Sequence, residues 1–195
     1  MRTPLSEKDV RSLRAGQVVH LDGIVYTGRD EVHVRALEKH DKGEGLPVDL
    51  KGAALYHCGP IVKDDDGGWT LVAAGPTTSA RMNGLEPRFI ETFGIRAIIG
   101  KGGMSQPTID AMKNFGCVYL AITGGAAVLA AKGVKRVVGV EWLDLGMPEA
   151  LWIFEAENLG PLIVGIDADG NSLFKKVDDE VRKNLTQVRK RLDVE

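Results

Sequence analysis

The sequence has little cysteine and no large excess of charge of either sign. Only two cysteines, Cys58 and Cys117, occur among its 195 residues. That number excludes a disulfide-dense scaffold, and it excludes an iron–sulfur cluster ligated by three or four thiolates of this chain. The 25 basic and 27 acidic residues nearly cancel, so neither nucleic acid nor an anionic membrane is expected as a partner.

Long apolar segments are also missing. The longest apolar run, residues 117–131, contains Gly124 and Gly125 and is too short to span a bilayer. Residues 1–10 are polar and charged, and this pattern does not indicate a secretory signal. We therefore expect a soluble cytoplasmic protein.

The composition that is present is that of a folded protein with many tight turns. Hydrophobic residues make up 44% and charged residues 27% of the chain, close to ordinary globular values. Glycine is the exception, with 24 residues in 195, well above the average of about 7%. Because no repeat, low-complexity segment or linker divides the chain, we expect a single domain over residues 1–195.

The first half of the chain predicts mostly antiparallel strands, because its strand-like runs are separated by short turns. The expected elements, in chain order, are a helix capped by Ser6 and Asp9 that ends near Leu13, strands over 17–21 and 23–26 joined by a turn at 22–23, a helix over 31–40, a loop over 41–47, a strand over 53–57, and a hairpin whose turn is residues 64–68 and whose second strand is 69–74.

The second half alternates strands and helices, which predicts β-α-β units with parallel pairing. A terminal amphipathic helix over about 176–192 carries an apolar stripe, which we expect to pack on the chain's own sheet rather than on a partner subunit. The fold class is therefore α/β with mixed sheets. The expected strands are 95–99, 117–122, 134–140 and 162–166, and the expected helices are 106–115 and 126–132.

Three segments at strand ends carry candidate site residues. In residues 75–82, a strand runs into Gly-Pro, then three hydroxyls that begin with Thr77, then Arg81. The alternative reading is that one of these hydroxyls only caps the following turn. Lys101 lies among glycines after a buried strand, where α/β sheets bind ligands, although such residues are also common in loops. Arg29 follows Gly28 and could bind a carboxylate, or only pair with a neighbouring acid.

Taken together, two arginines, a lysine and clustered hydroxyls would suit a small acid with two carboxylates. The sequence offers no metal site: its four histidines lack H-x-H or H-x-x-x-H spacing, so zinc is not expected. His57 and Cys58 are adjacent in a strand and should point to opposite faces. Cys58 is therefore expected to be a small buried hydrophobe.

Four strings in this order resemble one enzyme family. They are YTGRD at 26–30, HCGP at 57–60, GPTTSARM at 75–82 and GKGGM at 100–104, and the likeness extends from about residue 4 to 174. The chain resembles the β subunit of two-subunit class I fumarate hydratases, which is also the C-terminal domain of single-chain members. The tartrate dehydratase β subunit is similar.

The resemblance implies a swivelling β/β/α fold and a role for four residues. Thr77 corresponds to the residue that takes the C3 proton, and Arg29, Arg81 and Lys101 to residues that hold the two substrate carboxylates. Nearby Lys101 and the arginines would favour the ionised form of Thr77.

The resemblance also implies a partner. A separate α subunit would carry a [4Fe-4S] cluster and the catalytic aspartate, and this chain alone would bind no cofactor or metal. The expected assembly is a hetero-oligomer that hydrates fumarate to malate. Tartrate or mesaconate as substrate, or a non-catalytic swivelling module used for binding or assembly, are the alternatives.

Overall fold

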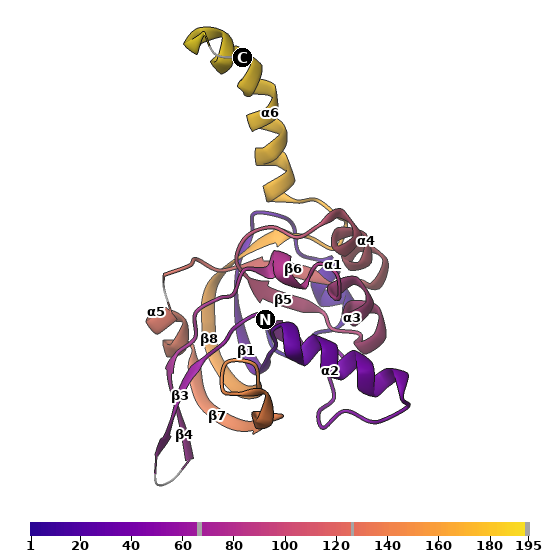
Figure 1. Ribbon diagram of the computed structural model, residues 1–195, viewed down its shortest axis with the longest axis vertical. Coiled ribbons are helices and arrows are strands. Elements are labelled where there is room, and N and C mark those ends of the chain that lie inside the picture. Colours follow the sequence, from indigo (N-terminus) through magenta and orange to yellow (C-terminus); the bar gives the residue numbers. More distant parts are fainter. Residues whose placement is uncertain (66–67, 126, 194–195) are drawn as a thin grey trace.

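The computed structural model describes residues 1–65, 68–125 and 127–193 and contains one six-stranded mixed sheet and a separate hairpin (Figure 1). The helices are α1 (Glu7–Arg11), α2 (Asp30–Asp41), α3 (Glu86–Phe93), α4 (Gln106–Phe115), α5 (Ala127–Lys132) and α6 (Leu173–Leu192), with short 3₁₀ turns η1 (Ser79–Met82) and η2 (Leu143–Leu145). The strands are β1 (Val18–Thr27), β2 (Ala54–Tyr56), β3 (Ile61–Asp65), β4 (Gly68–Ala73), β5 (Ala97–Gly100), β6 (Val118–Ala121), β7 (Val134–Glu141) and β8 (Leu151–Ile166).

The main sheet has the order β1-β2-β5-β6-β8-β7, and β8 also pairs with β1. Because β8 is hydrogen-bonded to both β6 and β1, the strands β1, β2, β5, β6 and β8 form a closed ring. The pairs β1–β2, β2–β5 and β5–β6 are parallel, whereas β8 is antiparallel to its neighbours. The expected α/β class with mixed sheets is confirmed.

Alternate residues of the parallel strands face two different cores. Tyr56 and Ile99 belong to the core inside the ring, and Leu55 and Ile98 to the core under the helices. The side chains that pack on Leu55 and Ile98 in the second core come in large part from helices α2, α3 and α4. Figure 1 shows these three helices together on one flank of the sheet. This two-residue alternation is what a strand buried on both faces requires.

Several expected elements are confirmed within a residue or two. The Ser6 hydroxyl accepts from Asp9 N, and the Asp9 carboxylate accepts from Ser6 N, so the capping box forms. Helix α4 begins and ends where the sequence predicts, and β3 and β4 form the antiparallel hairpin. Part of its turn, residues 66–67, and the first residue of the predicted helix 126–132 lie outside the described residues.

The predicted turn at residues 22–23 is wrong, because β1 runs through it. Gly23 has φ +95°, and the register of β1 against β8 shifts there, as in a bulge. The N-terminus covers this point: Thr3 N donates to Asp22 O at 2.9 Å, and Asp22 N donates to Met1 O at 2.8 Å. A bulge beside a third chain segment therefore has the same Asp-Gly signature as a turn.

The end of the chain differs from the prediction in two ways. Strand β7 pairs antiparallel with β8, because a short connection rather than a crossover helix joins them. Strand β8 begins at Leu151 instead of near 162, since pairing with β1 and β7 maintains it through residues that interrupt the apolar pattern.

The terminal helix also departs from expectation. It forms as predicted, but it extends away from the rest of the molecule (Figure 1), and the apolar stripe is exposed instead of covered by the sheet. None of the described helices is long and apolar enough to cross a membrane.

Candidate active site

The predicted site residues lie along one edge of the sheet. Strands β1, β2 and β5 are parallel and in register, with Thr27 opposite Tyr56 and Tyr56 opposite Ile99, so their carboxyl ends meet there. Arg29 follows β1, and Lys101 follows β5. This edge is where open α/β sheets usually bind ligands.

Thr77 is held between the ends of two strands. Its backbone N donates to His57 O, just after β2, at 2.6 Å, and its carbonyl accepts from Lys101 N at 3.4 Å. Ser79 N donates back to Lys101 O at 3.1 Å, and Thr78 and Lys101 form a parallel bridge. The structure therefore places Thr77 and Lys101 side by side, as neighbours in one extended segment of the sheet edge.

The capping alternative does not hold for this segment. Thr78 is the N-cap residue of η1, but its side chain makes no capping bond in the described part of the chain. The Thr77 hydroxyl likewise has no hydrogen-bond partner among residues 1–65, 68–125 and 127–193, and the Ser79 hydroxyl is buried in a different set of contacts. Thr77 itself is half-buried, and its hydroxyl makes no contact of this kind within the described chain.

Both arginines are paired with carboxylates of the protein itself. Arg29 Nη2 lies 2.9 Å from Glu149 Oε1, rather than near Asp30 or Glu31 as the surface-pair alternative expected. Arg81 Nη2 donates to Asp30 Oδ2 at 2.6 Å, which ties η1 to the first turn of α2. Each arginine is therefore oriented by a carboxylate of the protein, the same kind of group that a bound acid would present.

Glycines let charged side chains approach the edge closely. A Cβ on Gly59 would lie 2.6 Å from Arg29 Nη1, so the guanidinium would have to move if Gly59 carried a side chain. A Cβ on Gly124 would lie 3.5 Å from Lys101 Cδ and 3.9 Å from its Nζ. The Gly124–Gly125 turn after β6 therefore forms a wall beside the Lys101 side chain.

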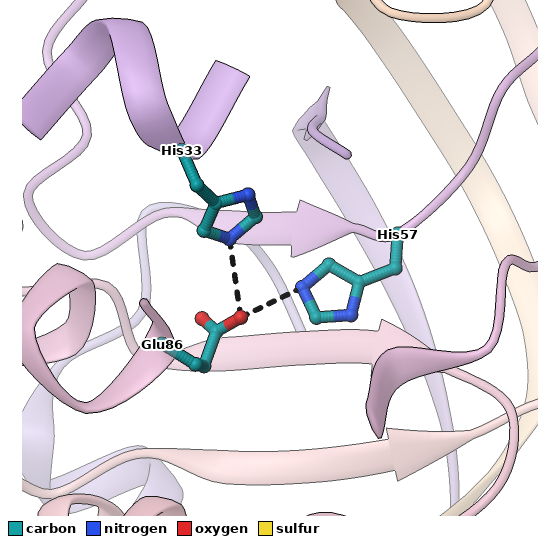
Figure 2. Close-up of side chains that lie close together, drawn as sticks. All are labelled: His33, His57 and Glu86. Carbon is teal, nitrogen blue, oxygen red and sulfur yellow. Dashed lines mark hydrogen bonds and ion pairs between the residues drawn. The ribbon is translucent and has the colours of Figure 1, made fainter. Parts of the chain in front are cut away.

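Below this edge lies a buried polar cluster that the sequence did not predict (Figure 2). Glu86 Oε2 is 3.1 Å from His33 Nε2 and 3.0 Å from His57 Nε2, and all three side chains are fully buried. His33 comes from α2, His57 from the segment after β2, and Glu86 from the first turn of α3. Three elements of different origin thus meet at one carboxylate oxygen.

The charge state of this cluster follows from its hydrogen bonds. Both nitrogens of His33 face acceptors, since Nδ1 lies 2.7 Å from Arg29 O and Nε2 faces Glu86 Oε2. Each nitrogen must therefore carry a proton, and His33 is an imidazolium paired with a carboxylate. His57 Nδ1 instead lies 2.9 Å from Ser79 Oγ. The Ser79 hydroxyl accepts from Tyr119 OH at 3.0 Å, which leaves its own proton for His57 Nδ1, so His57 is neutral.

The pKa shifts agree with this assignment. Burial by itself would lower the pKa of His33, but the charge and hydrogen bond of Glu86 outweigh it and raise the pKa above its usual 6.5. Burial lowers the pKa of His57. Burial opposes the ionised form of Glu86, yet the two histidines hold its pKa at about 2, and the N-terminal end of α3 favours the same charge.

Sequence signals for this cluster exist but are weak. His33 lies in the buried stripe of α2 with Ala36 and Leu37 three and four residues on, where an apolar side chain is usual. Glu86 has the same relation to Phe89 and Ile90 on α3. A titratable residue at such a position is noticed only when the helix and its direction are known, and α3 was not among the predicted elements.

The same three residues are the candidate metal ligands of the described chain. One ligand atom from each lies within 4.8 Å of the others, although the spacing of the histidines along the chain did not indicate such a group. The two cysteines, by contrast, are not suited to bind an iron–sulfur cluster. Both are buried, and burial raises the pKa of the Cys58 and Cys117 thiols, which opposes the thiolate that ligation needs.

Comparisons with known proteins point in one direction. The model of the family described as the fumarase C-terminus matches residues 1–177. The chain is 47% identical over 185 residues to a protein of Methanocaldococcus jannaschii provisionally named L(+)-tartrate dehydratase subunit beta, covering 94% of this chain and 95% of that protein. It is 41% identical over 190 residues to the L(+)-tartrate dehydratase subunit beta of Escherichia coli strain K12, covering 96% and 93%.

A longer relative is also similar. The chain is 43% identical over 188 residues to a protein of Geobacillus stearothermophilus provisionally named class I fumarate hydratase. The match covers 96% of this chain but 35% of that protein. The resemblance that the four sequence strings indicated is thereby confirmed.

Proposed function

This chain belongs to the fumarase C-terminus family, and we propose that it is the β subunit of a hydro-lyase that hydrates fumarate to malate together with an α subunit. Its relatives are named as dehydratase and hydratase proteins, two of them as β subunits. A dicarboxylate substrate and a hetero-oligomer with an α subunit follow from the same proposal.

One observation carries the proposal. Arg29, Lys101 and the segment from Thr77 to Arg81 meet at the carboxyl edge of one sheet, although they lie far apart in the sequence. Three cations beside a hydroxyl that has no partner in the described chain suit an acid with two carboxylates.

The proposed chemistry assigns a task to each residue. In the dehydration of malate, the C3–H bond breaks and its proton goes to the Thr77 oxygen. Negative charge builds up on the carboxylate next to C3 until the electron pair forms the C2=C3 double bond. The hydroxyl then leaves C2 as water, with a proton that an acid of the α subunit would supply. Fixed cations at that carboxylate stabilise the transition state more than the ground state, and this difference accelerates the reaction. Lys101, adjacent to Thr77, would favour the ionised hydroxyl that accepts the proton.

Substrate would exchange partners with the protein's own acids. Asp30 and Glu149 neutralise Arg81 and Arg29 in the structure. A carboxylate of the substrate would replace or bridge these acids, which keep the arginines oriented before it binds. Such preorganisation lowers the cost of binding.

Under this proposal a [4Fe-4S] cluster belongs to the α subunit. The residues of this chain do not fit the cluster, since its two thiols are buried and their raised pKa opposes ligation. The steps assigned to Thr77, Lys101 and the arginines therefore involve only this chain's own residues and the substrate.

Tartrate is the second candidate substrate, because two of the similar proteins are named as tartrate dehydratase β subunits. Fumarate, mesaconate and tartrate share the two carboxylates that the cations would bind, so the geometry suits all three.

The test is turnover by the complex of this chain with its α subunit, prepared without oxygen. Fumarate, malate, mesaconate and L(+)-tartrate are each supplied, and the β chain alone serves as the control. We expect turnover of fumarate and malate by the complex and none by the β chain. Turnover of tartrate alone would assign the second candidate, and no turnover of any of these acids would favour the non-catalytic module.

A further inference from the structure

A buried chain of polar contacts connects the segments that carry the proposed site residues. Glu86 is its centre, with His33 and His57 both at Oε2 (Figure 2). The second nitrogen of each histidine reaches outward. His33 Nδ1 lies 2.7 Å from the carbonyl of Arg29, and His57 Nδ1 lies 2.9 Å from the hydroxyl of Ser79.

We propose that this network positions the active site through two arms that start at Glu86. The His33 arm fixes the backbone of Arg29. The His57 arm fixes the backbone of Thr77 and, through the Ser79 hydroxyl, the segment that follows. This inference rests on the proposed function, since it takes Arg29 as a substrate ligand and Thr77 as the proton acceptor.

The His57 arm reaches Thr77 by two routes. The His57 carbonyl accepts from Thr77 N at 2.6 Å, so the ring and the Thr77 backbone belong to one rigid unit. The ring also receives the Ser79 hydroxyl, which in turn accepts from Tyr119 OH at 3.0 Å. Ser79 N is bonded to Lys101 O at 3.1 Å. Both ends of the Thr77 segment are therefore attached to the buried network.

The His33 arm acts at the start of α2. Arg29 is the N-cap residue of this helix and has an extended backbone. Its carbonyl accepts twice from His33, from the backbone N at 3.2 Å and from the ring at 2.7 Å. This double contact sets the direction in which the Arg29 side chain leaves the helix, toward Gly59 and Glu149.

Stability alone does not account for the cluster. Burying a charged pair costs free energy that apolar side chains of similar size would not cost. Moreover, Glu86 Oε1 and His57 Nε2 are buried without a hydrogen-bond partner in the described chain, although His57 Nε2 lies near Oε2. What the arrangement does provide is fixed geometry at two separate points of the site, and misplacement of catalytic groups by about 1 Å can cost about 10²-fold in rate.

Two matched substitutions separate the arms. In His33→Gln and His57→Gln, the glutamine amide lies near the former Nε2 and can still meet Glu86, while the outer contact to Arg29 O or Ser79 Oγ is lost. Phe89→Leu is the control, because Phe89 packs against His33 with ring centroids 4.4 Å apart but has no part in the polar contacts.

Activity of the complex with its α subunit gives the first readout. We expect His57→Gln to lower kcat by about 10²-fold with little change in KM, since Thr77 is displaced while the cations stay. We expect His33→Gln to raise KM roughly tenfold with a smaller effect on kcat, since in this proposal Arg29 binds the carboxylate that gains no charge in the transition state. Equal losses in both variants, or losses no larger than those of Phe89→Leu at matched stability, would overturn the proposal.

Amide hydrogen exchange in the full chain gives a readout that needs no activity. We expect His57→Gln and Ser79→Ala each to speed exchange at Thr77 N at least tenfold relative to the Phe89→Leu control. The rates are compared under conditions that give each variant and the control the same global stability. Equal exchange rates would refute positioning. A complex without hydro-lyase activity would instead refute the proposed function, while the exchange comparison still decides whether the network holds Thr77.

Metal analysis of the same full chain tests the alternative that His33, His57 and Glu86 bind a metal ion. One equivalent of zinc that is lost in Glu86→Gln would make His33, His57 and Glu86 a metal site and would overturn the hydrogen-bonded network. We expect no such metal in chain refolded or purified with zinc in the buffer.

Discussion

At the scale of single residues, Thr77 is the position where binding and chemistry are most easily separated. We expect Thr77→Ala to lower kcat by about 10²–10⁴-fold, because a missing general base has an effect of this size. Folding should be nearly unchanged, since the Thr77 hydroxyl has no partner in the described chain and its backbone bonds remain. Kinetics of the complex and thermal unfolding of the β chain measure the two effects.

The contradicting result for Thr77 is equally specific. Solvent-deuterium exchange at C3 of malate should fall with kcat in Thr77→Ala. If the exchange persists, the proton goes to another group, and Lys101, whose backbone is bonded to Thr77, is the next to substitute.

The two arginines should respond differently to lysine. Lysine keeps the charge but loses the planar fork that binds a carboxylate with two parallel bonds. We expect both Arg29→Lys and Arg81→Lys to lower kcat/KM. Arg81 is 49% exposed, so its pair with Asp30 contributes little stability and the melting temperature should hold. Arg29 is 21% exposed and packs over Gly59, so Arg29→Lys should also destabilise the fold. Wild-type kinetics in both variants would make these arginines surface charges only.

Glu86 should make acid stability depend on one buried carboxylate. Its pKa falls from 4.5 to about 2 on folding, so its contribution is fully present above pH 4.5 and is lost as the pH falls toward 2. We expect Glu86→Gln to cost about 3–5 kcal/mol at neutral pH, because His33 is left charged and buried. The difference in the free energy of unfolding between wild type and Glu86→Gln should shrink as the pH falls below 4.5.

Three other titratable groups interact electrostatically with the cluster of His33, His57 and Glu86. They are Asp30, Cys117 and Tyr119.

Chemical denaturation of both proteins across this range measures the effect. A wild-type advantage that stays constant down to pH 2 would mean that Glu86 is not ionised in the folded protein. The raised pKa of His33 has the opposite sign, since its contribution is present below pH 6.5 and is lost as the pH rises through the folded value. The lowered pKa of His57 acts in the same direction as Glu86, because folding then opposes proton binding.

At the scale of elements, the end of β5 shows how closely the polar network is fitted to the sheet. A Cβ on Gly100 would lie 2.0 Å from Ser79 Oγ and 3.1 Å from Tyr119 OH. We expect Gly100→Ala to push the Ser79 hydroxyl out of place, with a loss of about 1–3 kcal/mol in the free energy of unfolding. Gly139→Ala on β7 is the control, since its Cβ would meet only Ile153 Cδ1 at 3.8 Å.

Denaturant unfolding curves of the two alanine variants decide this point. If Gly100→Ala is as stable as Gly139→Ala, the strand end has room to move and the network is less rigid than its distances imply.

Elements with a strong local pattern are those that the sequence predicts well. The capping box of α1, the full length of α4 and the β3–β4 hairpin follow from residues next to one another in the chain. Strand β8 and the bulge at Gly23 depend on pairing with distant segments, which no local pattern records. The same division holds for the site. Arg29, Thr77, Arg81 and Lys101 stand out through their motifs, whereas the contact of His33 with His57 and Glu86 exists only after three elements have packed.

At the scale of the whole molecule, α6 contacts the sheet through its first turn, and the rest of the helix extends away from it. Phe174 packs against Tyr119, with ring centroids 6.0 Å apart, and a Cβ on Gly165 would lie 2.9 Å from its ring. The apolar stripe beyond it is 44–66% exposed in the described chain, at Val177, Val181, Leu185, Val188 and Leu192. The stability of the sheet should therefore depend on Phe174 in the first turn of α6 and not on the apolar stripe.

We expect truncation after Lys176 to leave the melting temperature of the chain nearly unchanged, because the deleted stripe buries little apolar area against the sheet. Phe174→Ala in the full-length chain is the matched comparison, and it should cost up to about 3 kcal/mol, since it removes the one aromatic side chain of α6 that packs on Tyr119. Calorimetry of the three proteins at equal concentration measures both effects. A truncated chain that melts well below the full-length chain would show that the helix folds back onto the sheet in solution, as the sequence pattern alone had suggested.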